Sequence, residues 1–422
     1  MTTPKPRLIV ADPSLADARG HHFALSLQIT RGAQLQGIET IWFTHKDFIA
    51  PDWLDDVSVN PVFSITMYDS YHPEKKNKLQ GDLDQKLLGE LFEGILRSRL
   101  SDNDHIYFHT GFGDLYRAMP TYLSLMKCGE FPYLHICTPY EPEAMPGTDQ
   151  GNTLPAVFGN MRNMSEIDKK LFFWAETPQL ALHYTLSYRF NVRALSLPPP
   201  IGINNNKLQH DSGTLTALYL GAAREEKGFL RLSEIVDRLY EHYGCTGKIC
   251  FVIQCSPQII GYLPSIKLAI EKLSGYPESY VKLIDSVMSE DEYHSQLLAS
   301  DVVLLMYDKE NYRIRGSGIA VEAISSDKCI LTTKGTFCAG LISHGGGEAV
   351  EGNDEAVAML LKMAENKHEY MQRAKIQGEE YRKVNSVTNY VSRIINQPKR
   401  GYSPAFFPST VIGHVSPSLL SL

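Results

Sequence analysis

The stretch LTALYLGAAREEKG, residues 215–228, is the part of the chain from which the fold can be predicted most directly. Its apolar first half is typical of a buried strand, and Gly221 permits a tight turn at the end of that strand. Arg224 and Lys227 then place two cations in a loop that leads into a helical pattern. A planar guanidinium and a compact ammonium in such a loop suit a diphosphate group. The alternative is a solvated loop in which the cations pair with the two neighbouring glutamates.

Outward from this stretch, short apolar runs alternate with helical patterns along the chain. We therefore interpret each half as a series of strand–helix–strand units. Such units predict a parallel sheet that binds ligands at the carboxyl ends of its strands. We expect an α/β protein of two Rossmann-like βαβ domains that face each other across a cleft. The expected strands are residues 8–11, 40–44, 105–109, 133–138, 171–176, 215–220, 248–254, 280–284, 302–306 and 329–332, and the expected helices are residues 20–36, 230–242, 291–299, 319–325 and 353–385, the last as one helix or two.

Composition marks the boundaries of the two domains. Residues 198–212 combine three consecutive prolines, a glycine and three asparagines with no periodic pattern, which is typical of a linker. The chain after residue 396 is rich in Pro and Ser and reads as an irregular tail. We therefore predict an N-terminal domain at 1–197, a linker at 198–212, a C-terminal domain at 213–396 and a tail at 397–422.

The overall composition is that of an ordinary globular protein. Of the 422 residues, 43% are hydrophobic and 21% are charged, and the formal net charge of -7 argues against nucleic acid as the main partner. The seven cysteines are scattered and lack a paired zinc spacing. The apolar run at 8–11 is too short for the core of a signal peptide, and no run approaches the length of a membrane span. We therefore expect a cytoplasmic protein.

A second segment, YDKENYRIRGSGIAVEA at residues 307–323, follows an apolar strand and opens a helix. Gly316 and Gly318 lack side chains, so a phosphate can approach the N–H groups at the start of the helix. Glu322 lies one turn deeper on the same face, where its carboxylate can accept hydrogen bonds from both hydroxyls of a ribose. The alternative is a surface glutamate on a capped helix. Two phosphate-suited loops after separate strands of one sheet argue against that alternative.

These two segments resemble the GT-B glycosyltransferases, and specifically glycosyltransferase family 4, over about residues 215–385. The shared features are the strand, glycine and cations of 215–228, the phrase SDVVLL at 300–305, and Glu322-Ala323, which matches the second half of the family's paired-glutamate motif. The resemblance implies a nucleoside-diphosphate sugar as donor, bound by the C-terminal domain. It implies donor contacts from Gly20, Gly221, Arg224, Lys227, Arg315, Gly316, Ser317, Gly318 and Glu322.

Two positions depart from the family pattern. Ala222 stands where the family has an arginine next to the first glycine, so Arg224 would act from two residues later. Ile314 occupies the place of the first glutamate of the pair, which leaves Arg313 or Arg315 near the reacting sugar. A variant with Tyr, Arg and Ser-Gly before the glutamate occurs among relatives, and we interpret the departures as subfamily variation.

In the N-terminal, acceptor-side domain the resemblance predicts two contacts. Gly20, in the loop after the first strand, would approach the donor, and His109, at the end of its strand, would contact the transferred sugar or the acceptor. His135 competes for this role, but it lies in the middle of a strand, as a core histidine does. The pair His21 and His22 invites a metal site, yet adjacent side chains on a helix diverge. We predict a capping or surface role for this pair.

The resemblance implies hexosyl transfer (EC 2.4), as in polysaccharide biosynthesis, from a nucleotide sugar to a glycan, lipid-linked or small-molecule acceptor. We expect a retaining mechanism without metal or other cofactor, in which His109, Arg224 and Lys227 are catalytic and the cations stabilise the leaving diphosphate. Residues 102–104 spell the DxD of metal-dependent enzymes, but they precede a strand where a metal-binding DxD follows one. We interpret them as a turn. A lipid-linked acceptor is compatible with peripheral membrane association.

Other enzyme classes find little support in the sequence. No G-x-S-x-G nucleophile elbow and no P-loop is present, and Gly111-Phe112-Gly113 lacks the third glycine of a dinucleotide-binding motif. One alternative stays open: a non-catalytic sugar-nucleotide-binding or scaffold protein on the GT-B fold. The missing first glutamate and the displaced arginine are the features that favour it.

Overall fold

The computed structural model describes residues 5–69, 83–126, 131–144, 154–162, 164, 170–200, 213–243, 247–256, 263–342 and 345–396. The chain forms two compact units. The first comprises the chain up to Pro198 together with the segment from Asn385 that contains α16, and the second comprises the chain from Pro199 to Val384. Most of the predicted linker, residues 201–212, and the whole predicted tail lie outside the described residues.

The first unit is built on a seven-stranded sheet in which all the paired strands run parallel. Its order is β3-β2-β1-β4-β5-β6-β7. The central strand β1 is buried throughout, which explains why its sequence is continuously apolar. The strands are β1 (Leu8–Ala11), β2 (Thr40–His45), β3 (Ser58–Phe63), β4 (His105–Phe108), β5 (Tyr133–Thr138), β6 (Leu171–Ala175) and β7 (Val192–Ala194).

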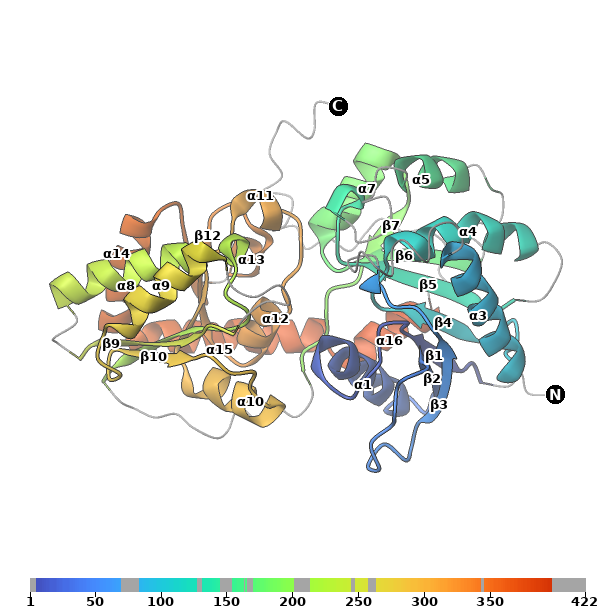
Figure 1. Ribbon diagram of the computed structural model, residues 1–422, viewed down its shortest axis with the longest axis horizontal. Coiled ribbons are helices and arrows are strands. Elements are labelled where there is room, and N and C mark those ends of the chain that lie inside the picture. Colours follow the sequence, from blue (N-terminus) through green and yellow to red (C-terminus); the bar gives the residue numbers. More distant parts are fainter. Residues whose placement is uncertain are drawn as a thin grey trace. The chain divides into compact units, whose positions relative to one another are not determined.

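Helices cover both faces of this sheet (Figure 1). On one face α3 packs against α4 and α4 against α5, while α1 packs against α16 on the other. The right-handed crossovers that leave β1 and β3 in opposite directions require these two faces. The helices are α1 (Gly20–Gln34), α3 (Leu83–Arg97), α4 (Gly113–Met126), α5 (Leu154–Arg162), α7 (Pro178–Tyr188) and α16 (Val387–Asn396), with a short 3-10 turn η2 at Pro142–Ala144.

The position of α16 differs from the predicted domain boundary, which assigned residues up to 396 to the second domain. Figure 1 shows α16, in red, beside α1, in blue. The two helices approach so closely that a Cβ on Gly32 of α1 would lie 2.6 Å from the carbonyl oxygen of Val387. The hydroxyls of Tyr390 in α16 and Tyr107 in β4 form a buried hydrogen bond of 2.6 Å. The sequence analysis predicted neither this helix nor its packing, which joins segments far apart in the chain.

The second unit contains a six-stranded sheet, again with all paired strands parallel, in the order β10-β9-β8-β11-β12-β13. Asp301 holds β11 beside β8, since its carboxylate accepts the N–H of Thr216 at 2.8 Å and pairs with Lys367 at 2.8 Å. The strands are β8 (Leu215–Tyr219), β9 (Ile249–Gln254), β10 (Val281–Ile284), β11 (Val302–Leu305), β12 (Cys329–Thr333) and β13 (Gly347–Val350).

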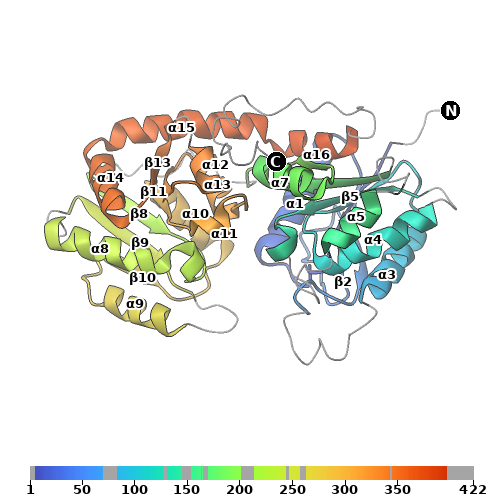
Figure 2. The ribbon, with the colours of Figure 1, turned by 90° about the horizontal axis from the view of Figure 1, so that it is seen from above.

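Successive residues of the central strands enter two separate cores. Ala217 and Leu304 point into a core with α8, α9 and α14, whereas Leu218 and Val303 point into a core with α10 and α12. Figure 2 shows these two groups of helices on opposite sides of the sheet. The helices are α8 (Phe229–Tyr243), α9 (Pro264–Ser274), α10 (Glu290–Ala299), α11 (Lys309–Tyr312), α12 (Gly318–Ser325), α13 (Phe337–Leu341), α14 (Asn353–Glu365) and α15 (Lys367–Val384).

The predicted fold class, α/β with two Rossmann-like domains, is therefore confirmed. The predicted helical stretch at 353–385 is two helices, α14 and α15. The elements that were not predicted are β3, β7, β13, α3, α4, α5, α7, α9, α11, α13 and α16. Among the described residues, no helix has both the length and the apolar character needed to cross a membrane.

Candidate functional site

Each sheet has one point where the strand order reverses, between β1 and β4 in the first unit and between β8 and β11 in the second. At such a point the loops that follow two adjacent strands turn to opposite faces, which leaves a crevice at the carboxyl ends of the strands. Both segments singled out in the second half of the sequence follow the strands of such a pair, β8 and β11. Each unit therefore has its own candidate site at the carboxyl ends of its strands.

The backbone of the loop after β8 requires its two glycines. Gly221 has a φ of 101°, and its N–H donates to Gln254 Oε1 at 2.7 Å. Gly228 has a φ of 76°, and a Cβ at this position would lie 2.0 Å from the carbonyl oxygen of Met306. Only glycine fits there without displacing the end of β11. The loop is thus held in one conformation between the two strands.

The two cations of this loop have different surroundings. Arg224 Nη1 pairs with Glu226 Oε1 at 3.0 Å, as the solvated-loop alternative predicts. Its Nε, however, is buried and has no hydrogen-bond partner among the described residues. The ammonium of Lys227 lies 3.1 Å from where a Cβ on Gly221 would be, directly over the end of β8. Burial, together with the charge of Arg224, lowers the pKa of Lys227 to about 8.

The loop after β11 is tied to the loop after β8. The N–H of Asp308 donates to the carbonyl oxygen of Glu226 at 2.9 Å. Ile319, in the first turn of α12, lies 3.3 Å from where a Cβ on Gly221 would be. The guanidinium of Arg315 lies over the ring of Tyr312, 5.4 Å from its centroid. The two segments that suggested a phosphate site therefore adjoin each other in the structure.

The N-terminus of α12 is well defined. Ser317 is its N-cap and accepts the N–H of Ala320 at 3.3 Å, while the Tyr307 hydroxyl lies 3.1 Å from the same Oγ. A Cβ on Gly318 would meet nothing within 4 Å, so the backbone there borders open space. The positive end of the helix dipole at an accessible backbone favours an anion.

Glu322 lies one turn into α12, and it is half-buried rather than on an exposed surface. The hydroxyl of Tyr293 in α10 donates a hydrogen bond to Glu322 Oε2. Burial raises the pKa of Glu322, whereas the Tyr293 hydrogen bond and the charge of Lys227 act against this rise. Lys227 also interacts electrostatically with Arg315. The structure thus brings two cations and a carboxylate together at the end of β8, and it adds Tyr293, which no sequence motif indicated.

The first unit carries a cluster of polar side chains at its own reversal point. Asp12 Oδ2, directly after β1, lies 2.6 Å from His22 Nδ1 and 3.1 Å from His109 Nε2. The outer nitrogen of His22 lies 2.9 Å from the Tyr68 hydroxyl, and Ser26 Oγ lies 3.0 Å from His109 Nε2. Burial alone raises the pKa of Asp12, but the two imidazoles lower it below its ordinary value. The carboxylate is therefore ionised between two histidines.

The residues that the sequence analysis singled out in the first unit differ in position and in exposure. His109 follows β4 as expected, but its side chain is fully buried, at 0% exposure, whereas that of His22 is 14% exposed. Gly20 has a φ of 69° at the start of α1, and a Cβ there would meet nothing within 4 Å. His135 is a core residue, hydrogen-bonded to His105 and to the Trp174 indole.

The DxD-like run at 102–104 forms a turn, as interpreted. Asp104 pairs with Arg7 at 2.7 Å and accepts the N–H of Ser101, so it closes the turn before β4. Asp12 was missed by sequence reasoning, and His22 was considered only together with its neighbour His21. In the structure His22 is paired with Asp12 instead.

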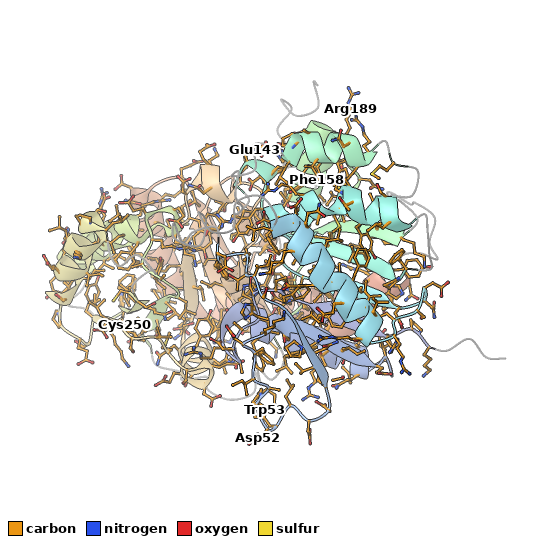
Figure 3. The ribbon with its side chains drawn as sticks, turned by 45° about the vertical axis from the view of Figure 1, so that its right-hand side comes forward. Asp52, Trp53, Glu143, Phe158, Arg189 and Cys250 are labelled. Atoms are coloured by element: carbon orange, nitrogen blue, oxygen red, sulfur yellow. The ribbon has the colours of Figure 1, made fainter. Side chains whose placement is uncertain are left out.

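The loop after β2 adds an aromatic surface at the same edge of the first sheet. Trp53 is 56% exposed, and its ring packs edge-on against Phe23 with centroids 5.8 Å apart. Figure 3 shows Trp53 and Asp52 on this loop, at the lower margin of the view. The loop after β2 therefore presents a large exposed aromatic ring.

Solved structures with the same fold are glycosyltransferases. The structure of the trehalose-6-phosphate synthase of E. coli bound with UDP-2-fluoro glucose matches with a TM-score of 0.67 at 14% identity, covering 94% of this chain and 99% of that one. A glycosyltransferase from Rickettsia africae matches with a TM-score of 0.66 at 11% identity, covering 95% and 100%. A UDP-forming α,α-trehalose-phosphate synthase from Burkholderia xenovorans, solved with glucose-6-phosphate, matches with 0.62 at 13%, covering 93% and 100%.

At these identities the likeness shows the fold alone, and it confirms the predicted GT-B fold. Neither a protein-family model nor a curated protein sequence matches the chain. The likeness to family 4 in particular stays a prediction.

Proposed function

We propose that this protein is a glycosyltransferase that moves a sugar from a nucleoside-diphosphate sugar to a hydroxyl of a second sugar. The observation that carries the proposal is the grouping of Lys227, Arg224 and Glu322 where β8 and β11 diverge. Cations beside a helix N-terminus suit a diphosphate, and a carboxylate one turn deeper suits the diol of the ribose. The GT-B fold of the chain agrees with this assignment.

The proposed role of the cations depends on the negative charge of the leaving diphosphate. When the sugar leaves, negative charge develops on the diphosphate, and preorganised cations stabilise that charge more in the transition state than in the ground state. Lys227 and Arg224 supply two positive charges, and the start of α12 supplies a partial one. In this proposal the diphosphate needs no divalent metal, and no cofactor takes part.

The donor diol is assigned to Glu322. Its Oε2 accepts from Tyr293, so the second oxygen can accept from a ribose hydroxyl while Tyr293 fixes the orientation of the carboxylate. UDP-glucose is the first donor to test, because the E. coli structure with the same fold holds a UDP-2-fluoro glucose.

The acceptor is assigned to the first unit. A Burkholderia protein with the same fold was solved with glucose-6-phosphate. In this chain Trp53, in the loop after β2, offers an exposed ring at the carboxyl end of the first sheet. We therefore propose a sugar or sugar phosphate as acceptor, and on the resemblance to family 4 we propose that the anomeric configuration is retained. Proton NMR of the product's anomeric coupling distinguishes retention from inversion.

A donor panel tests the proposal. We expect one class of nucleoside-diphosphate sugar to raise the melting temperature, and the corresponding nucleoside monophosphate to raise it less, because the monophosphate lacks the second phosphate. Stabilisation by no nucleotide sugar would contradict the proposal. A donor that binds without transfer to any sugar acceptor and without slow hydrolysis would favour the non-catalytic alternative.

A further inference from the structure

Three side chains of the first unit present ligand atoms to one point. These are Asp12, His22 and His109, which come from the end of β1, the first turn of α1 and the end of β4. One carboxylate oxygen and two ring nitrogens lie within 4.8 Å of one another. A tetrahedral zinc ion holds its ligand atoms about 3.3 Å apart, given bonds of about 2.0 to 2.1 Å. Small rotations of the two imidazoles therefore suffice to bring all three atoms to one ion.

The outer atoms of all three side chains already have partners. Asp12 Oδ1 accepts the N–H of Ser14 at 2.8 Å. The outer nitrogen of His22 lies 2.9 Å from the Tyr68 hydroxyl, and that of His109 lies 2.9 Å from Thr110 Oγ1. When the inner nitrogens bind a metal, the outer ones carry the protons, and both hydroxyls can accept them. Metal-binding histidines are oriented by this kind of second hydrogen bond.

Burial and charge favour a cation at this point. The carboxylate of Asp12 is almost fully buried, and a buried anion needs a compensating positive charge close by. His109 closes one side of the cluster, while the partly exposed His22 leaves a side open to solvent. Solvent therefore reaches the cluster beside His22.

We propose that Asp12, His22 and His109 bind a divalent transition-metal ion of the zinc class at the carboxyl edge of the first sheet. Two imidazoles and one carboxylate suit zinc, cobalt, nickel or ferrous iron, whereas magnesium and calcium prefer sites made of oxygen atoms. The site lies within one unit and does not depend on the proposed sugar transfer.

The test uses the untagged full-length chain, so that no affinity tag contributes histidines. Cobalt is titrated in as a spectroscopic substitute for zinc, and calorimetry measures zinc and magnesium. We expect one equivalent of cobalt with the strong visible absorption of a four- or five-coordinate site, displaced by zinc and not by magnesium.

Variants assign the site to its ligands. His22→Ala should weaken zinc binding on the order of 100-fold or more, because it removes one of three ligands. The control His368→Ala, at an exposed histidine of α15, should leave zinc binding unchanged. His22 is partly exposed, so this variant should fold, and circular dichroism checks that it does. Asp12→Asn should weaken zinc binding as well. The proposal is overturned if wild type takes up no cobalt, if His22→Ala binds zinc as tightly as wild type, or if magnesium displaces cobalt.

Discussion

Replacing Lys227 by methionine removes one charge from the donor site and keeps an unbranched side chain that is one atom shorter. The ammonium lies over Gly221 at the end of β8, where the proposed diphosphate sits. Loss of a charged hydrogen bond costs about 1.5 to 3 kcal/mol, so Lys227→Met should weaken donor binding roughly 10- to 150-fold. The exposed Lys282 on β10 provides the control, since Lys282→Met should leave donor affinity unchanged.

The pKa of Lys227 adds a dependence on pH. In the free protein this pKa is lowered to about 8, mainly because of burial. A bound diphosphate favours the ammonium and raises the pKa, so binding above pH 8 must take up a proton. The protonated fraction of the free site falls from about nine-tenths at pH 7 to about one-tenth at pH 9, and the donor's Kd should therefore rise roughly tenfold over this range.

Calorimetry with a nucleotide sugar separates the two cations, because the donor's diphosphate diester does not titrate above pH 7. Arg224→Ala should weaken binding by a similar factor and shift the pH dependence to higher pH, since an arginine stays protonated throughout and its charge no longer lowers the pKa of Lys227. Lys227→Met should lose that dependence. If the wild-type Kd is constant from pH 7 to pH 9, or if Lys227→Met binds the donor as wild type does, Lys227 does not contact the diphosphate.

Three further predictions concern other parts of the structure. Glu322→Gln should raise the donor KM more than it lowers kcat. Tyr293→Phe should weaken donor binding about 2- to 12-fold, because it removes the hydrogen bond that orients the Glu322 carboxylate. Unchanged donor kinetics in both variants would show that neither residue belongs to the ribose site. Gly228→Ala should lower the free energy of unfolding in urea by more than about 1 kcal/mol, because its φ is positive and its Cβ would meet Met306, and an unaltered midpoint would show that the loop can move. Tyr390→Phe should cost about 1 kcal/mol in the same assay by removing its buried hydrogen bond with the Tyr107 hydroxyl, and an unaltered midpoint would show that this bond does not stabilise the fold.

The second unit was well predicted from sequence because its signals are local. The strand, the glycines and the cations of residues 215–228 are contiguous, and so are those of 307–323, so each loop can be interpreted from its own residues. Parallel strands bring their carboxyl ends to one edge, and this rule was enough to expect the two loops to meet. Tyr293 could not be found in this way, because its hydroxyl reaches Glu322 from another helix.

The polar cluster of the first unit could not be predicted from the sequence. Asp12, His22 and His109 come from three separate segments, and none of the three stands in a recognisable spacing. Helix geometry predicted that the side chains of His21 and His22 diverge, but their ring centroids lie 5.9 Å apart, and His22 is paired with Asp12, ten positions earlier. The return of α16 to the first unit is a long-range contact of the same kind.

Sugar transfer itself is the most direct test of the central claim. Purified protein is incubated with the nucleotide sugar that stabilises it and with a set of sugars and sugar phosphates, and both the released nucleoside diphosphate and the glycosylated product are quantified by mass spectrometry. The account predicts that one acceptor accelerates release, that diphosphate and product form in equal amounts, and that Lys227→Met slows both. Release that no acceptor accelerates, with no glycosylated product from any donor and acceptor pair, would contradict it.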